Sequence, residues 1–252
     1  MQKILAGMSV LILSVTWLGL GRADDAAVTA ILDKAIKETG GADNLLKLQG
    51  CITKAKAIQH EAGQPDTVFT GTWYNEGADK MRSETEQDIK GKKVVEIIVV
   101  NGSKGWKKTA NGASQQIEKE ELAAEQDNAY LSWISTLAPL KNKEFKLTSL
   151  PDAMVHARAA VGFSVALKDH RDVKMYFDKE NGLLVKCERK VWDTENKKAV
   201  TEEVLYSDYK TVDGIKVAMK IAFKWDGKPV MEIEASDVRL QEKLDDKLFT
   251  RP

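Results

Sequence analysis

Apolar and polar residues alternate with a period of two along most of the chain, which predicts a protein built mainly of β-strands. In the clearest segment, 215–225, lysines take one face and the other carries Ile215, Val217, Met219, Ile221, Phe223 and Trp225. Such alternation is typical of a strand with one buried and one solvated face. Comparable patterns predict further strands at 67–74, 79–86, 93–100, 144–150, 163–168, 172–178, 183–192, 199–207 and 229–238.

The segment 173–192 predicts a hairpin whose apolar face has two possible uses. That face carries Val173, Met175, Phe177, Leu183, Val185 and Cys187, and the opposite face carries Lys174, Lys186, Glu188 and Lys190. We interpret the charged face as solvated rather than as a docking patch, because acidic residues interrupt the lysines. The apolar face either closes a core or lines a pocket.

Helical spacing interrupts the strands at two places. Apolar residues at helical intervals predict a helix over 25–39, which the glycines at 40 and 41 end, and a short helical segment over 42–50. The segment 117–138 also loses the period of two, and Pro139 ends it. About ten strands joined as sequential hairpins form one twisted sheet that curls, because each pair adds roughly 20° of twist. The pattern therefore predicts a curled antiparallel sheet covered by an N-terminal and a mid-chain helix.

The N-terminus has the three parts of a signal peptide. Lys3 precedes an apolar run, and Gly21 and Ala23 stand at the positions that a signal peptidase reads, so we expect residues 1–23 to be cleaved. A membrane anchor is the alternative, although an apolar run of 17 residues is marginal for spanning a bilayer. With this export signal we expect a periplasmic protein. The length of the mature chain predicts a single domain over 24–252.

Charge excludes one class of partner. Without Lys3 and Arg22, the 38 basic residues become 36 against 38 acidic ones, a net charge of −2. A nearly neutral chain without a basic block is not expected to bind nucleic acid.

The residues that usually carry catalysis are sparse and scattered. His60, His156 and His170 stand far apart and form no metal-binding motif, so we expect no enzyme, no metal and no cofactor. An active site would require two of them to meet in space beside a carboxylate. Cys51 and Cys187 enter an oxidising compartment and either form a disulfide or stay buried as small apolar residues; we favour burial.

Several motifs resemble the LolA-like outer-membrane lipoprotein-sorting superfamily. They are the signal peptide, "TGGADNLLKL", "GTWYNEGADKMR", "NGSKGW", the mid-chain helix, "YFDKENGLLVK", "YSDYKTVDGIKV" and "LDDKLFTRP", and together they cover nearly the whole mature chain. The resemblance implies an unclosed β-barrel whose apolar interior, lidded by helices, takes up acyl chains. It also implies an arginine that locks the lid, but Glu76, Gly77 and Ala78 occupy that position here, and Arg82 follows a little later.

The pattern and the resemblance together predict a cavity for an apolar ligand. Its expected lining is Trp73, Met81, Trp106, Trp133, Ile134, Leu137, Met175, Phe177, Val185, Val217, Met219, Ile221 and Phe223. Aromatic and methionine side chains adapt to varied apolar ligands. We expect a monomer that carries a lipid or a lipoprotein acyl chain. The alternative is an envelope sensor or interaction protein that uses the same fold to bind a protein partner.

Overall fold

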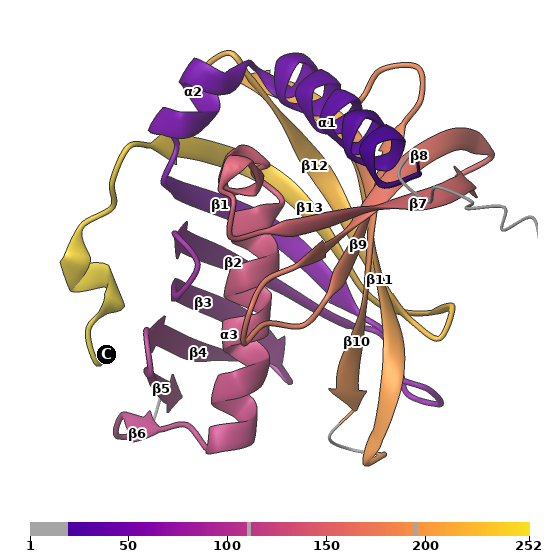
Figure 1. The fold of residues 1–252 in the computed structure, drawn as a ribbon. Coiled ribbons are helices and arrows are strands. Elements are labelled where there is room, and N and C mark those ends of the chain that lie inside the picture. Colours follow the sequence, from indigo (N-terminus) through magenta and orange to yellow (C-terminus); the bar gives the residue numbers. More distant parts are fainter. Residues whose placement is uncertain (1–19, 110–111, 194–195) are drawn as a thin grey trace, which may run out of the picture.

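The computed structural model of the chain describes residues 20–109, 112–193 and 196–252, and Figure 1 shows how their elements are arranged. The predicted signal peptide lies outside the described residues except at 20–23, which belong to the first helix.

Two helices begin the described chain, as the sequence predicts. Helix α1 spans Leu20–Thr39 and helix α2 spans Ala42–Lys47. A Cβ atom on Gly40, which lies between them with a φ of 154°, would come within 2.9 Å of the carbonyl oxygen of Gly214. A glycine is therefore required at this turn. Among the residues that the structure describes, no helix combines the length and the apolar character needed to cross a membrane.

Within the described residues, thirteen strands form one antiparallel sheet. They are β1 (Gly50–Gln59), β2 (Thr67–Glu76), β3 (Lys80–Ile89), β4 (Lys92–Asn101), β5 (Lys104–Thr109), β6 (Gln115–Gln116), β7 (Lys146–Val155), β8 (Arg158–Ala166), β9 (Val173–Asp178), β10 (Leu184–Asp193), β11 (Lys198–Val212), β12 (Ile215–Trp225) and β13 (Lys228–Gln241). The strand order is β6-β5-β4-β3-β2-β1-β13-β12-β11-β10-β9-β8-β7.

The sheet has two wings that meet in its middle. Strands β1–β6 form one wing, β7–β13 form the other, and β1 pairs with β13 between them. Within the described chain the end strands β6 and β7 do not pair with each other. The predicted unclosed antiparallel barrel is confirmed, with more strands than the expected ten or so.

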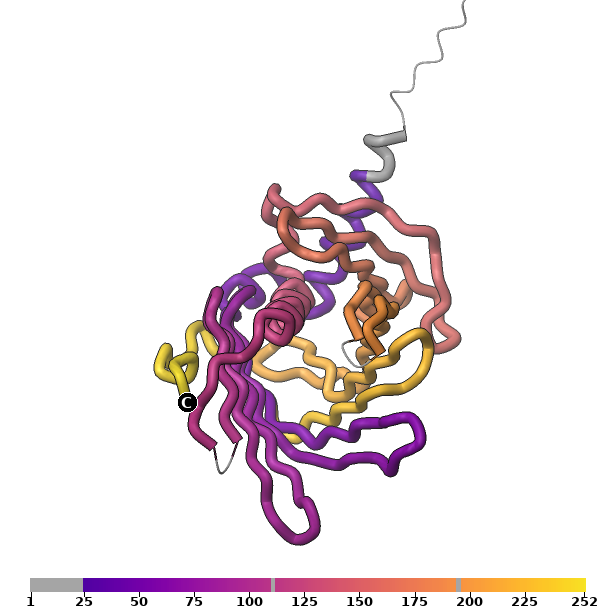
Figure 2. The backbone as a smooth tube through the Cα atoms, turned by 90° about the horizontal axis from the view of Figure 1, so that it is seen from below, coloured from indigo at the N-terminus to yellow at the C-terminus, as the bar shows by residue number. Residues whose placement is uncertain are grey.

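The helices lie on the concave side of the curled sheet, as Figure 2 shows. Helix α3 (Lys119–Ile134) crosses β2, β3 and β4, while α1 packs on β7, β8 and β12. A 3₁₀ helix, η1 (Ala138–Lys141), follows α3. The mid-chain helix is therefore shorter than predicted, because the chain turns at Leu137, whose φ is 69°.

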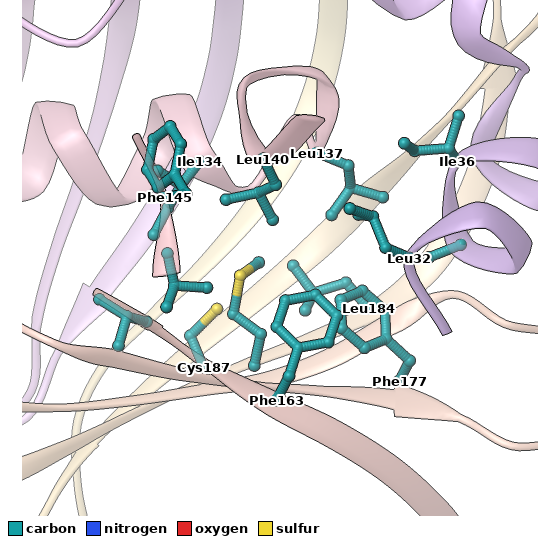
Figure 3. Close-up of a cluster of buried hydrophobic side chains, with 14 of the residues drawn as sticks. Leu32, Ile36, Ile134, Leu137, Leu140, Phe145, Phe163, Phe177, Leu184 and Cys187 are labelled. Carbon is teal, nitrogen blue, oxygen red and sulfur yellow. The ribbon is translucent and has the colours of Figure 1, made fainter. Parts of the chain in front are cut away.

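The main core fills the wing that α1 covers. Leu32 and Ile36 of α1 meet Leu140 of η1 and the two phenylalanines Phe163 and Phe177 of β8 and β9 (Figure 3). All five side chains are buried. This wing is therefore packed between helix and sheet.

Strand β1 is the longest element that the alternation does not predict. Its inward positions hold Cys51, Thr53, Ala55 and Ala57, which are small or polar. Alanine has a low preference for strands, so the segment lacks the β-branched and aromatic pattern of its neighbours. Pairing with β2 and β13 holds it in the sheet.

Candidate functional site

A cavity of about 570 Å³ lies between helix α3 and the concave face of the sheet. Most of its lining comes from α2, α3, strands β1–β3 and strands β11–β13. Ligand pockets in proteins usually enclose about 300 to 1,000 Å³. The interior is therefore only partly filled by side chains, and the remaining space is large enough for an apolar chain or a small organic molecule.

The inward face of β12 forms one apolar wall of this cavity. The alternating residues of the strand all line it, namely Ile215, Val217, Met219, Ile221, Phe223 and Trp225. The wall continues onto β13, where Ile233 pairs with Ile221 and Met231 pairs with Phe223. The predicted alternation of β12 is thus confirmed, and its apolar side faces open space.

Three more residues from the predicted lining border the cavity. Trp73 of β2 and Met81 of β3 lie on the opposite wing of the sheet, and Leu137 follows α3. Ligand binding by any of the predicted residues stays a prediction.

Four other predicted residues belong to the packed core and not to the cavity wall. Ile134, Met175 and Phe177 are fully or almost fully buried in the cluster that Figure 3 shows. Trp133 packs against the same cluster, with its ring 5.8 Å from the ring of Phe145. The physical reason is the cover of helices, because α1 and the end of α3 close the face of β8–β10, whereas α1 covers only part of β12 and most of the inward face of that strand lines the cavity. The apolar face of the 173–192 hairpin is therefore mainly core.

Val185 lies on the outer face of the sheet, contrary to the prediction. The pairing of β10 with β9 shifts register between Leu184 and Lys186, so Val185 is the extra residue of a bulge. Leu184 and Cys187 both face the core, while Val185 packs outside against Tyr176. A bulge breaks the alternation on which the prediction depended.

Trp106 also faces outward. It packs with Val99 and with Phe249, which belongs to the C-terminal 3₁₀ helix η2 (Asp246–Phe249). Phe249 is fully buried, and η2 lies against β3 and β4 on the side opposite α3. The outer face of this wing is apolar because the C-terminal segment covers it. An apolar residue on these strands can therefore be buried on the inner face, towards α3, or on the outer face, against the C-terminal segment.

Helix α3 presents a polar face to the cavity that the sequence does not reveal. Glu125, Asn128 and Ser132 line the cavity and share one side of the helix, because their spacing is three and then four residues. In sequence such a face is indistinguishable from a solvated one. The cavity therefore has a mainly apolar wall on β12 and β13, and a helical wall in which these three polar residues accompany Leu131.

The carboxyl group of Glu125 has little support from hydrogen bonds. Its pKa is raised, first by burial and then by the nearby carboxylates Glu121 and Glu96, although Asn128 and Lys107 oppose the shift. Asn128 donates to it at 3.4 Å. Lys107 lies nearer to other acids, 3.1 Å from Glu96 and 3.4 Å from Glu121. Glu125 thus faces the cavity without a close cationic partner among the described residues.

Arg189 connects α3 to the sheet beside the cavity. From β10 it donates to Glu202 on β11, to the carbonyl oxygen of Asp127 and to the side-chain oxygen of Asn128, each at 2.6 Å. The other carboxylate oxygen of Glu202 accepts from Trp225 at 3.2 Å. The side chains of Arg189 and Glu202 are only 4% and 8% exposed. This buried network fixes the position of α3 over the sheet.

The comparisons with known proteins agree on the architecture. No protein-family model matches the chain, and no curated protein matches its sequence. A LolA superfamily protein from Nitrosomonas europaea superimposes with a TM-score of 0.61 at 11% identity, covering 89% of this chain and 97% of the other. A domain described as an outer membrane lipoprotein-sorting protein from Vibrio parahaemolyticus gives a TM-score of 0.57 at 13% identity, covering 89% and 96%. The chain has a LolA-like fold. A DUF1329 family protein from Desulfovibrio piger gives a TM-score of 0.58 at 14% identity, covering 88% and 97%.

At the position where the resemblance implied a lid-locking arginine, the residues of this chain make other contacts. Glu76 accepts a hydrogen bond from the backbone of Leu244 at 2.6 Å and pairs with Lys80 at 2.8 Å. Arg82 donates to the carbonyl oxygen of Leu248 and pairs with Glu84. Both residues therefore hold the C-terminal segment on the outer face. Two other arginines contact the mid-chain helix, namely Arg189 from β10 and Arg171, which pairs with Asp127 at 2.6 Å.

The surroundings of His60 and His156 share Glu232, while His170 has an aromatic partner of its own. His60 lies 2.9 Å from Asp66 and 3.7 Å from Glu232. His170 stacks on Tyr130 with ring centroids 4.0 Å apart. His156 lines a second, smaller cavity of about 280 Å³, to which Glu232 also contributes. None of the three lines the large cavity.

The two cysteines are free thiols in the LolA-like sheet. Strands β13, β12 and β11 lie between β1, which carries Cys51, and β10, which carries Cys187. Cys187 is fully buried, and burial raises the pKa of its thiol to about 12. Within the described residues, no group of three or more potential ligands is arranged to hold a metal ion.

Proposed function

We propose that this protein is a periplasmic carrier or binding protein for the acyl chain of a lipoprotein or another apolar ligand. One observation carries the proposal, namely the continuous apolar wall of β12 and β13 along a cavity of about 570 Å³. Removing apolar surface from water stabilises a complex by about 25 cal/mol per Å² of that surface, so such a wall favours binding. The LolA-like fold adds support, and the proposal includes no catalytic step.

The export signal and the fold together support a secreted protein with a single domain over 24–252, which we propose to be a monomer. Export of the full chain into the periplasm of a bacterial host tests the first part. Intact-mass measurement should give a mature protein that begins at Asp24. A protein that retains residues 1–23 and sediments with the membrane would instead support an anchored form.

Lipid binding is tested on the exported protein in two ways. Mass spectrometry of organic extracts should identify co-purified lipid, and a neutral probe such as N-phenyl-1-naphthylamine should brighten on entering the cavity. Ala235→Phe places a ring in the cavity, because Ala235 lines it, and should weaken probe binding several-fold. Glu234→Phe adds the same ring at the next, exposed position and should bind the probe as the parent does.

The two possible failures have different meanings. A protein that purifies without lipid and ignores every apolar probe contradicts the carrier proposal. A single stoichiometric protein partner recovered from envelope extract, again without lipid, would favour the sensor alternative.

A further inference from the structure

The pairing of β11 with β12 shows which lining residues lie at each end of the cavity. Glu202 pairs with Trp225 at one end, Tyr206 with Ile221 in the middle, and Val212 with Ile215 at the other end. Because α3 lies over the same cavity, its residues can be assigned to these two ends through their contacts.

The end near α2 is mainly apolar, although Lys216 also lines it. Its lining residues Leu45, Leu137, Leu184 and Ile215 are all buried, and they belong to the core beneath α1. An apolar chain that reaches this end contacts side chains from α2, from the turn after α3 and from two strands. This end suits the tail of an amphiphile.

The opposite end has Phe223 and Trp225 on its sheet wall and polar side chains of α3 facing them. Asn128 belongs to it, because Arg189 joins Asn128 to Glu202, and Glu125 lies one helical turn before Asn128. Both oxygens of Glu202 already accept hydrogen bonds, from Arg189 and from Trp225. Glu125 is therefore the carboxylate at this end with capacity left for a ligand.

The cations around the cavity do not neutralise Glu125. Among the described lining residues the one basic side chain is Lys216, which neighbours Ile215 at the apolar end and lies 3.8 Å from Glu38. Near Glu125, Lys107 is shared with Glu96 and Glu121. The field at the polar end is consequently negative, which favours a positive or hydrogen-bond-donating group and disfavours an anion.

We propose that the cavity takes an amphiphile tail-first, with its apolar chain towards α2 and an amine head hydrogen-bonded to Glu125. This inference rests on the proposed function, because it concerns the same cavity. It adds a head-group preference: an amine binds best, a neutral hydroxyl less well, and a carboxylate least. The amine keeps its proton and donates N–H hydrogen bonds to the Glu125 carboxylate, so no covalent step is involved.

The test compares dodecylamine, dodecanol and dodecanoate, which share one chain length, as competitors of N-phenyl-1-naphthylamine at pH 7. We expect dodecylamine to bind about tenfold more tightly than dodecanoate, which corresponds to about 1.4 kcal/mol. Glu125→Gln should remove most of the advantage of the amine over the alcohol and strengthen binding of the carboxylate. Glu120→Gln, the same change at an exposed position of α3, should preserve the parent order.

The outcomes separate this inference from the function on which it rests. Equal binding of all three ligands, tighter binding of dodecanoate, or an order unchanged in Glu125→Gln would overturn the head-group assignment while the carrier function stands. If neither the probe nor any of the three ligands binds, the carrier proposal itself fails and the head-group assignment fails with it.

Discussion

The buried ion pair between Arg189 and Glu202 allows a quantitative test of how α3 is held over the cavity. Arg189→Met keeps much of the side-chain volume but removes three charge-assisted hydrogen bonds, each 2.6 Å long. It also leaves Glu202 charged, with its side chain only 8% exposed. Removing one partner of a buried pair typically costs about 3 to 5 kcal/mol of unfolding free energy, because the other charge stays uncompensated.

This loss is measurable by urea unfolding of the exported protein. With a denaturant slope of about 3 kcal/mol per M, the midpoint of Arg189→Met should fall by about 1 to 1.7 M. Arg239→Met is the matched control, because Arg239 pairs with Asp237 at 3.0 Å and both side chains are exposed. Such surface pairs contribute about 0.2 to 1 kcal/mol, so the midpoint of the control should move by at most about 0.3 M.

A double variant distinguishes the cost of the uncompensated buried charge from the cost of lost packing. In Arg189→Met combined with Glu202→Gln no charge stays buried, and the amide oxygen of the new side chain can still accept from Trp225. We expect the double variant to regain at least about half of the stability that Arg189→Met loses. If Arg189→Met and Arg239→Met shift the midpoint equally, the network does not hold α3 as argued.

Two further predictions concern the cavity wall. Met219→Asp places a carboxylate on the apolar face, where Met219 is 7% exposed, so it should lower the free energy of unfolding by more than about 2 kcal/mol and weaken probe binding. Lys220→Asp is the control: it falls on the outer face beside Glu234 and should lower the free energy of unfolding by less than about 1 kcal/mol. Equal melting temperatures for the two variants would show that the register is misread. Glu125→Gln should be more stable than the parent at pH 7, because burial raises the pKa of the carboxyl and the folded state holds the proton more tightly than the unfolded state. That advantage should shrink as the pH falls towards about 4, where both states become protonated. Thermal melts of the two proteins across pH 4 to 7 that stay parallel would contradict the effect of the half-buried position of Glu125 on its pKa.

The fold could be predicted from sequence where the alternation of apolar and polar residues continues through a long segment. In β12 every second residue from Ile215 to Trp225 is apolar, and all of them face the cavity. A single bulge is enough to break such an inference, as Val185 shows, because one extra residue moves every later side chain to the other face. The register of β10 depends on its pairing with β9, and alternation within the strand does not contain that information.

The helices that cover the sheet account for a second group of wrong predictions. Alternation indicates that Trp106 has an apolar side, but the C-terminal helix η2 lies on the outer face of the neighbouring strands β3 and β4, and the ring packs there against Val99 and Phe249. Likewise Met175 and Phe177 face inward as predicted, yet α1 closes the space above them. Whether an inward residue lines a cavity or fills a core depends on which helix lies over it, and that is a tertiary contact between segments far apart in sequence.

The polar wall of the cavity illustrates why the chemistry of the site was harder to predict than its fold. A helix that crosses open space needs polar residues on the side that faces the space, for the same reason that a surface helix needs them towards water. Glu125 and Ser132 therefore have the spacing of solvated residues in the sequence, although they line the cavity. The apolar wall attracts a chain of any kind and gives little discrimination between ligands, since burial of apolar area is non-directional. Discrimination must come from the polar groups around that wall, so residues of α3 that sequence patterning assigns to water are among those expected to decide which ligand is carried.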